Sequence, residues 1–295
     1  MSHNFSRITF SEQLEKLKET EKWLQGIGIV TSGSRFQEIL KIVEAVVEHY
    51  NRGRIADLET KYGSQTVWAA LLDSLAFIDI HEEFRYLKSH ERPISKLRSI
   101  LEGPLHSWEE SPDKNNIQPR NTLFELEVAA RLKKSGLQIT GFDDVDFIFQ
   151  HATINVQCKR VHSPKQVKAN IDKASEQFRK RMDPEGKIRG IICLAIDKLT
   201  GTEDKIIKVN NEGEIGLRLN QVINTFREQY KHTWIGLLNI NILAVMIFLR
   251  AIIDIKDNPY DLRTSACQVA VCAISDEQYL QFTDKRLIKN LSEKL

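Results

Sequence analysis

The sequence predicts an α/β protein in which a helical N-terminal part precedes a β-sheet domain flanked by helices. From about Phe10 to Leu105 apolar residues recur at helical spacing, whereas later in the chain short apolar runs alternate with helical patterns. The stretch HSWEESPDKNNIQPRNT, which separates the two parts, is rich in Pro, Asn and charge, as is typical of a linker. We therefore expect an all-α N-terminal domain over residues 1–115 and an α/β domain over residues 116–295.

Four helices are expected in the N-terminal domain. Their apolar positions recur every three or four residues over 10–24, 34–50, 64–87 and 93–101. Ser34 is placed to cap the second of these helices. The stretch GIGIVTSGS before it resembles a glycine-rich phosphate loop, but it follows a helix and lacks the lysine, which favours a turn and a helix cap.

The α/β domain is expected to begin with a helix, three short strands and a second helix. The first helix ends in two lysines and Gly136, the charge and the cap typical of a helix C-terminus. In the second helix Ser163 is expected to cap, Pro164 to take the first position and Gln166 to complete a capping box. The strands are expected over 137–142, 145–150, 153–161, 190–199, 242–254 and 266–275, and the helices over 120–136, from 163, 216–230 and 275–295.

The composition is that of a soluble globular protein, because 41% of the 295 residues are hydrophobic and 28% are charged. The charge is unevenly divided. Up to position 115 there are 15 Lys and Arg against 18 Asp and Glu, and after it 27 against 22. A polyanionic partner is therefore expected to bind the second part of the chain.

The location of the protein is expected to be cytoplasmic. The first residues lack the apolar core of a signal peptide, and the four cysteines form no CxxC pair, so each is interpreted as a small buried hydrophobe in a reducing compartment. The longest apolar stretch, WIGLLNINILAVMIFLRAIIDI, contains Asn239, Asn241, Arg250 and Asp254. These breaks and the β-branched content favour a buried central strand over a membrane span. We therefore expect no membrane partner.

Polar residues alternate with apolar ones in INVQCKR, which indicates a strand with one polar face. A tight turn at His151 and Ala152 would pair this strand with VDFIFQ. Asp146 would then lie almost opposite Gln157, with Asp144 near Lys159. We expect these side chains to share one face of the sheet, because side chains alternate along each strand.

The helix before these strands carries two carboxylates with different expected roles. Projected at 100° per residue, Glu125 falls inside the apolar arc and Glu127 outside it, beside Arg131. Glu127 is therefore interpreted as a surface partner of Arg131, four residues further along. A carboxylate that faces the sheet is costly unless it is paired, and a cation shared with Asp146 would remove that cost for Glu125.

The order of FELEVAARL, a short strand, DVDFIF, INVQCKR and a basic helix resembles the core of the PD-(D/E)xK nucleases, the restriction-endonuclease-like group, and in particular members with Gln in place of the acid. The resemblance covers roughly residues 120–209 and does not include the N-terminal helices. The family's Pro is absent before Asp146, where Val145 stands. The resemblance implies a restriction-endonuclease-like mixed sheet flanked by helices.

The resemblance also implies a catalytic site. By position, Glu125 matches the helix acid, Asp146 the strand acid, and Gln157 and Lys159 the paired positions of the signature. Glu125, Asp146 and Gln157 would then bind the metal, Mg²⁺ or Mn²⁺, for which carboxylate and amide oxygens are suitable ligands. Lys159 would orient or deprotonate the attacking water and stabilise the charge that builds on the phosphoryl group. The loss of one ligand charge at Gln157 is expected to weaken metal binding.

The segment after this strand is expected to contact the nucleic acid. Residues 159–181 contain eight Lys and Arg against only Asp172 and Glu176, while Val167, Ile171, Ala174 and Phe178 are expected to face inward. Lysine and arginine on the outer face could bind phosphates without reading sequence, although a merely solvated helix face is the alternative. The nucleic-acid-binding residues expected from this pattern are Arg160, Lys165, Lys168, Lys173, Arg179 and Lys180.

Three functions are compatible with these features. The first is a magnesium-dependent endonuclease or exonuclease that hydrolyses phosphodiester bonds, of DNA in preference to RNA because most of the relatives it resembles cut DNA in restriction, defence or repair. The second is a decayed nuclease-fold module that binds nucleic acid or recruits a partner protein. The third is a structural helical adaptor, in which Glu125 and Lys159 would be ion-paired with no cation. The mildly acidic N-terminal helices are expected to form a dimer contact or to bind a partner subunit.

Overall fold

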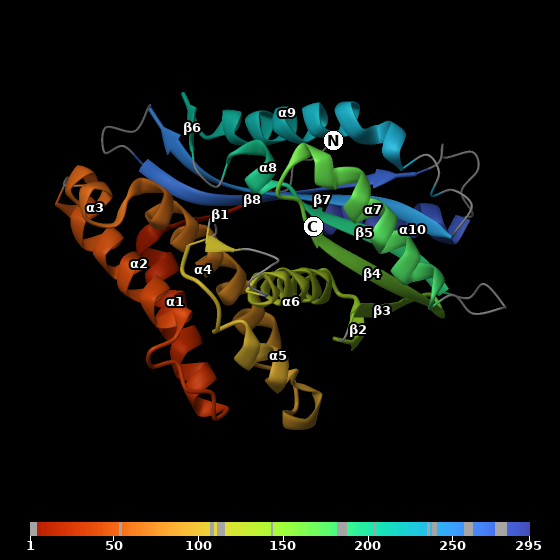
Figure 1. Ribbon diagram of the computed structural model, residues 1–295, viewed down its shortest axis with the longest axis horizontal. Helices are drawn as coiled ribbons and strands as arrows, with labels where there is room; N and C mark the ends of the chain where they lie inside the picture. The colour runs from red at the N-terminus through yellow and green to blue at the C-terminus, as the bar shows by residue number, and fades with distance from the viewer. Residues whose placement is uncertain are drawn as a thin grey trace.

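The computed structural model describes residues 5–52, 55–106, 109–110, 116–142, 144–181, 188–202, 205–234, 237, 241–256, 262–274 and 282–295. Within these ranges ten α-helices surround one mixed sheet of eight strands (Figure 1). The strand order is β1-β8-β7-β5-β4-β3-β2, and β6 pairs with β7 beyond the end of β5. The expected α/β class with helices around a mixed sheet is confirmed.

The N-terminal part contains the four expected helices and three elements that were not expected, namely β1, α3 and a 3₁₀ turn. Strand β1 (Phe5–Thr9) leads directly into α1 (Phe10–Gly26), where Thr9 and Glu12 form a capping box. The helices that follow are α2 (Arg35–Asn51), α3 (Ile55–Tyr62), α4 (Ser64–Phe84) and α5 (Ile94–Ser99), with a short 3₁₀ turn, η1 (Ser89–Glu91), before α5. The expected cap of the second helix is confirmed, because the Ser34 hydroxyl accepts a hydrogen bond from the backbone N–H of Gln37.

The next segment follows the expected order of one helix, three strands and a second helix. It comprises α6 (Gln118–Lys134), β2 (Gln138–Gly141), β3 (Val145–Phe149), β4 (Ala152–Arg160) and α7 (Pro164–Arg179). Pro164 begins α7 as expected, but the Ser163 side chain makes no capping hydrogen bond, so the predicted capping box does not form. Strands β2, β3 and β4 are antiparallel, and β5 (Ile188–Ala195) runs parallel to β4.

The remaining elements complete the sheet and cover it. They are α8 (Asp197–Thr200), β6 (Ile206–Val209), α9 (Gly213–Tyr230), the 3₁₀ turn η4 (Lys231–Thr233), β7 (Ile242–Ile255), β8 (Leu262–Ala273) and α10 (Phe282–Lys294). The final helix is expected over 275–295, and residues 275–281 of this range lie outside the described residues. The apolar stretch proposed as a central strand is β7, which lies between β5 and β8, so that prediction is confirmed. Among the described residues no helix is long and apolar enough to cross a membrane.

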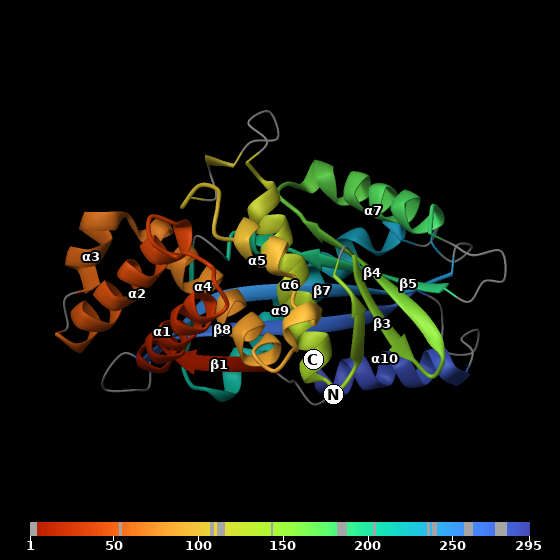
Figure 2. The same cartoon turned by 90° about the horizontal axis from the view of Figure 1, so that it is seen from below.

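The helices form a layer on each face of the curved sheet. Helices α1 to α6 and α10 cover one face, with α6 against the sheet, as the view from below shows (Figure 2). Helices α7, α8 and α9 cover the other face (Figure 1). Each face has its own hydrophobic cluster, one built around residues such as Phe77 and Phe147 and the other around Phe178 and Ile247.

The N-terminal part is not purely helical and shares its core with the rest of the chain. Strand β1 pairs antiparallel with β8, so the first described residues form an edge of the sheet. The expectation of an all-α segment over residues 1–115 is wrong in this respect, because FSRIT hydrogen-bonds with a strand more than 250 positions away. Leu17 and Phe36 from this segment belong to the same buried cluster as Val128 and Met246. The hydrophobic core therefore extends across the predicted boundary.

Candidate functional site

Strands β3 and β4 form a two-residue hairpin whose register differs by two residues from the predicted one. Phe149 pairs with Ala152, and the loop consists of Gln150 and His151, both with positive φ (49° and 71°). This geometry is typical of a type I′ turn, which matches the twist of antiparallel strands. The predicted turn at His151 and Ala152 is therefore wrong.

A shift of two residues keeps every side chain on its predicted face, because side chains alternate along a strand. Asp146 lies opposite Asn155 instead of Gln157. Asp144, Asp146, Gln157 and Lys159 still project from the same face, opposite to the one that carries Val145 and Val156. The expected common polar face therefore forms, with different pairs across it.

The polar side chains on this face are connected by hydrogen bonds. The Asn155 Nδ2 donates to Asp146 Oδ1 at 2.7 Å. The Gln157 Nε2 donates to Asn155 Oδ1 at 2.7 Å and to Asp144 Oδ2 at 3.1 Å. Asn155 and Gln157 are 1% and 2% exposed, so their amides are fixed inside the protein while the two carboxylates reach its surface. Asn155 was missed as a site residue, although its alternation with Gln157 places it on the polar face.

Arg181, just after α7, bridges the two carboxylates. Its Nη2 lies 2.6 Å from Asp144 Oδ2 and its Nη1 lies 3.3 Å from Asp146 Oδ2. One guanidinium group therefore neutralises part of the charge of two aspartates on the same strand face. Arg181 was counted among the basic residues of this segment but was not identified as part of the site.

Gly141 leaves the space that Asp146 needs. A Cβ at Gly141 would lie 3.0 Å from Asp146 Oδ2 and 3.4 Å from its Cβ. The close approach occurs where the β2–β3 register is irregular, between Ile139 and Gly141. The position of the strand acid therefore depends on a glycine in the neighbouring strand.

Lys159 is fixed by the helix on the same face of the sheet. Its Nζ donates to Gln177 Oε1 of α7 at 2.7 Å. Burial lowers the pKa of Lys159, and the carboxylates of Glu125 and Asp144 oppose this shift in part. The lysine is thus held by an amide rather than a carboxylate, and its neutral form is more accessible than that of a solvated lysine. Gln177 was not anticipated from the sequence.

Glu125 belongs to the opposite layer of the molecule. Helix α6 packs on the face of β4 that carries Ile154 and Val156, and Glu125 Oε2 accepts a hydrogen bond from Lys96 Nζ of α5 at 3.0 Å. The structure therefore places Asp146, Gln157 and Lys159 together on one face and pairs Glu125 with the N-terminal part. The charge of Glu125 opposes in part the lowering of the Lys159 pKa by burial.

Glu127, interpreted as a surface residue, is fully buried. It lies 3.4 Å from both Arg131 and Arg250, and burial raises its pKa against the attraction of these arginines. The helical projection failed because α6 is packed against α4 as well as the sheet, so it has no wide solvated face. The expected pair with Arg131 exists, but inside the protein.

The outer face of α7 is basic, as expected, but Arg160 is not part of it. Val167, Ile171, Ala174 and Phe178 are buried as expected. The exposed residues on the opposite side are Lys165, Lys168, Lys173, Arg179 and Lys180. Arg160 does not join this face, because its Nη1 pairs with both carboxylate oxygens of the buried Glu110 at 3.0 and 3.1 Å. No local pattern indicated this partner, which lies 50 positions earlier in the chain.

The hairpin carries carboxylate oxygens of the kind that the implied metal would need, and these oxygens are contacted by amide N–H groups and by Arg181. Within the described ranges no three His, Cys, Asp or Glu side chains are grouped as a metal site. The hairpin brings two carboxylates together, and carboxylate oxygens are hard ligands suited to Mg²⁺ or Mn²⁺, whereas the amide nitrogens of Asn155 and Gln157 are the atoms that point toward them. The contact of Arg181 with both aspartates shows that this pair accommodates a positive charge.

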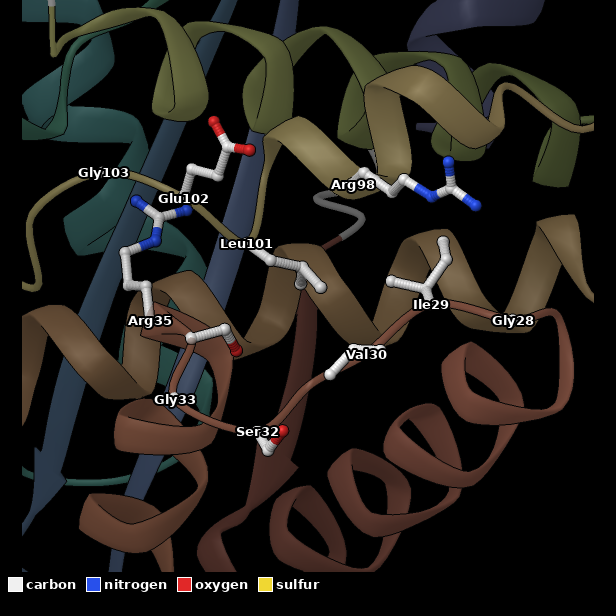
Figure 3. Close-up of a pocket in the computed structure, with 11 residues that line it drawn as sticks. Gly28, Ile29, Val30, Ser32, Gly33, Arg35, Arg98, Leu101, Glu102 and Gly103 are labelled. Carbon is white, nitrogen blue, oxygen red and sulfur yellow. The ribbon is translucent and has the colours of Figure 1, made fainter.

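The glycine-rich stretch of the N-terminal part lines a cavity of about 610 Å³ (Figure 3). The guanidinium groups of Arg35 and Arg98 lie at opposite ends of this cavity and do not converge. Gly33 N–H donates to Gln37 Oε1 at 2.8 Å, and Ser34 caps α2. Gly33 and Ser34 thus form hydrogen bonds at the start of α2. This confirms the interpretation of the glycine-rich stretch as a turn and a helix cap.

The chain was compared with models of protein families and with curated protein sequences, and no match was found in either comparison.

Proposed function

We propose that this protein is a metal-dependent nuclease that hydrolyses phosphodiester bonds, with DNA as the preferred substrate. The observation that carries the proposal is the polar face of the β3–β4 hairpin. It presents Asp144, Asp146 and Gln157 beside Lys159, and α7 adds exposed cationic side chains next to it. Oxygen ligands for a divalent cation, an amine and a phosphate-binding surface are the parts that phosphodiester hydrolysis requires.

The arrangement of the elements supports a restriction-endonuclease-like core. Helix α6 is followed by the antiparallel strands β2, β3 and β4, then by α7 and by β5 parallel to β4. The residues that resemble the family signature lie on β3 and β4, the two central strands of this unit. This support rests on topology together with site chemistry, because a fold alone does not define an activity.

The side chains have distinct roles in the proposed reaction. Oxygens of Asp146 and Gln157 would hold Mg²⁺ or Mn²⁺, which when bound would neutralise charge on the phosphoryl oxygens. Lys159, held by Gln177, would orient the attacking water and take up its proton, for which its lowered pKa is favourable. Glu125 would act through its charge on Lys159 rather than by contact with Asp146.

The exposed face of α7 would bind the substrate backbone. Lys165, Lys168, Lys173, Arg179 and Lys180 lie on this exposed side. Contacts of this kind give affinity that falls with added salt and carries no sequence choice. Arg160 is not part of the proposed surface, because it is committed to Glu110.

Cleavage of plasmid, linear duplex and single-stranded DNA and of structured RNA, with Mg²⁺ or Mn²⁺, tests this proposal. We expect metal-dependent cleavage that Lys159→Ala lowers by about 100-fold or more, the scale of a lost general acid or base. Lys289→Ala on α10 is the matched control, because it removes an exposed lysine paired with Glu293 far from the hairpin in sequence. Equal rates for Lys159→Ala and the intact protein would refute the assigned role.

A second candidate function is a decayed nuclease fold that binds nucleic acid or recruits a partner protein through α1 to α5. The observation in its favour is Arg181, which gives Asp144 and Asp146 a permanent cation from the chain itself. In this case the protein would bind DNA without binding Mn²⁺ and without cleaving. Calorimetric titration with Mn²⁺ distinguishes the two functions.

A further inference from the structure

Two of the cysteines are direct neighbours in the sheet. Cys158 on β4 lies in register with Cys193 on the adjacent parallel strand β5. Both side chains lie on the face of the sheet that α6 covers, and the two thiols are hydrogen-bonded to each other. In the described strands, neither Cys267 nor Cys272 has a cysteine as its register neighbour. The sheet therefore brings one pair of thiols together and keeps the other two cysteines out of that pair.

The spacing of adjacent strands suits a disulfide between these two positions. Neighbouring strands lie about 4.7–4.9 Å apart, which is inside the range of roughly 4.4–6.8 Å that the Cα atoms of a disulfide span. The spacing is shorter than the commonest Cα separation of about 5.5–6 Å, so the bond would form with little movement of the chain but under some strain. Strained disulfides are reduced more easily than structural ones, which is the property of a reversible, regulatory bond.

The two thiols differ in exposure and in acidity. Cys158 is partly exposed, whereas Cys193 is fully buried. Burial, together with the hydrogen bond to Cys158, raises the pKa of Cys193 well above its usual value, so Cys193 stays protonated and does not react first with an oxidant. An oxidant therefore meets Cys158 first. A second thiol beside a partly exposed cysteine is the arrangement in which an oxidised cysteine is resolved to a disulfide.

We propose that Cys158 and Cys193 are a redox modification site, in which a peroxide converts the two thiols reversibly into a disulfide between β4 and β5. The sulfur of Cys158 attacks one oxygen of hydrogen peroxide, the O–O bond breaks, and a sulfenic acid and one water molecule form. The sulfur of Cys193 then attacks the sulfenic sulfur, and the hydroxyl group leaves as a second water molecule with the proton of Cys193. The two thiols lose two electrons in total and the peroxide gains them, and a dithiol such as dithiothreitol reverses the bond by thiol–disulfide exchange.

The position of Cys158 connects this bond to the candidate site. Cys158 lies between Gln157 and Lys159, whose side chains project from the opposite face of β4. A bridge that shifts β4 toward β5 disturbs the contact of Lys159 with Gln177, which depends on a single hydrogen bond of 2.7 Å. We therefore expect the oxidised protein to cleave DNA more slowly than the reduced protein. This consequence rests on the proposed function, whereas the disulfide itself does not.

Mass spectrometry of the full chain tests the inference without any cleavage of nucleic acid. The reduced protein is treated with hydrogen peroxide in the absence of metal, its remaining thiols are blocked with N-ethylmaleimide in denaturant, and it is digested with trypsin without reductant. Trypsin cuts after Lys and Arg, so the two cysteines fall in separate peptides, 135–159 and 190–198. We expect these peptides to be joined by a disulfide, and we expect dithiothreitol to lower the joined species by about 10-fold or more.

Matched variants exclude indirect explanations. Cys158→Ser and Cys193→Ala should each abolish the joined species. In Cys193→Ala the sulfenic acid of Cys158 should persist and react with dimedone, because the thiol that resolves it is absent. Cys272→Ser removes another partly exposed thiol and should leave the yield of the joined species unchanged. Near-ultraviolet circular dichroism of each variant checks that the fold is retained, and Cys193→Ser provides a second substitution if Cys193→Ala does not fold.

The outcomes separate this inference from the proposed function. Absence of the joined species from the folded protein overturns the inference even if the protein cleaves DNA. Equal amounts of bridges that contain Cys267 or Cys272, or a bridge that forms only in urea, overturn it as well. The joined species together with no cleavage of any nucleic acid by the reduced protein supports the redox site and contradicts the nuclease proposal. Equal cleavage by the reduced and the bridged protein overturns the connection to Lys159.

Discussion

Asp73 of α4 is a buried carboxylate at the junction between the N-terminal helices and α6. Its Oδ2 lies 2.9 Å from Arg120 Nε and 3.8 Å from Arg35 Nη1. Burial would raise the pKa of Asp73, but Arg120, and then Arg35 and Arg250, overcome this effect and lower it to about 2. We expect Asp73→Asn to lower the free energy of unfolding by about 3–5 kcal/mol, because it removes the carboxylate that pairs with two buried arginines.

Urea unfolding monitored by circular dichroism measures this loss. Asp172→Asn, which removes an exposed partner of Lys168, serves as the control and should change stability by less than about 0.5 kcal/mol. A loss for Asp73→Asn that is as small as for the control would show that the buried pairs do not contribute in this way.

His162, between β4 and α7, makes the stability depend on pH. Burial, followed by the positive charges of Arg160 and Lys198, lowers its pKa from 6.5 to about 4. Between these values the unfolded chain takes up a proton that the folded protein does not, so stability falls as the pH is lowered from about 6.5 to about 4. The expected change is roughly 1–2 kcal/mol, since the partly exposed ring retains some hydration.

The difference in pH dependence between the intact protein and His162→Gln measures this contribution. Stability of the variant should fall less steeply in the same window. His232→Gln, at an exposed position in η4, should follow the intact protein. Parallel curves for His162→Gln and the intact protein would contradict the assignment.

The sequence predicted the surroundings of a polar residue well where local alternation determines the face of the sheet on which it lies. It predicted them poorly where a segment distant in sequence buries the residue. Asp146, Gln157 and Lys159 share a face because the period of a strand is a property of the local chain. Glu127 and Arg160 are buried because partners far away in sequence, Arg250 and Glu110, lie against them. Helical projection describes a helix with one covered side, and it fails for α6, which is covered on two.

At the scale of elements, the β3–β4 turn fixes the register of the candidate site. Gln150 and His151 both have positive φ, a conformation that costs residues with a Cβ roughly 1–2 kcal/mol each. We expect the double change Gln150→Asn and His151→Gly to raise the free energy of unfolding by about 1 kcal/mol while keeping the register, because Asn-Gly suits a type I′ turn.

Chemical denaturation checks this expectation, with the opposite substitution as a control. His151→Val places a β-branched residue at positive φ and should be destabilising by about 1 kcal/mol or more. If the Asn-Gly variant were less stable than the intact protein, the turn would not have the proposed geometry.

The elements that sequence patterns identified are those with a repeated apolar signal, and the ones they missed are short. Helices α1, α2 and α4 and strand β7 were anticipated because each has several turns or a long apolar run. Strands β1 and β6 have five and four residues and are stabilised by pairing with β8 and β7. Such pairing is a tertiary property, so no local pattern in FSRIT or IIKV could reveal it.

At the scale of the whole molecule, the boundary between the predicted domains is crossed by both a sheet and a core. Strand β1 extends the sheet at β8, and helices α4 and α6 pack against each other in one buried cluster. A linker composition near residues 107–115 predicted separate domains, but linker composition reports only on the local chain. Most of that stretch lies outside the described residues.

This shared core predicts that the described chain unfolds as one cooperative unit. Removal of α1 to α5 would expose the buried face of α6 and of the sheet, so neither part should retain its structure alone. In hydrogen exchange measured by mass spectrometry at increasing urea, peptides from α2 and α4 should lose protection at the same urea concentration as peptides from β4 and β7. Loss of protection in α2 and α4 at clearly lower urea would instead show a separately folding helical domain, as the linker composition suggested, and would place the contacts of Asp73 and Arg120 at an interface between domains.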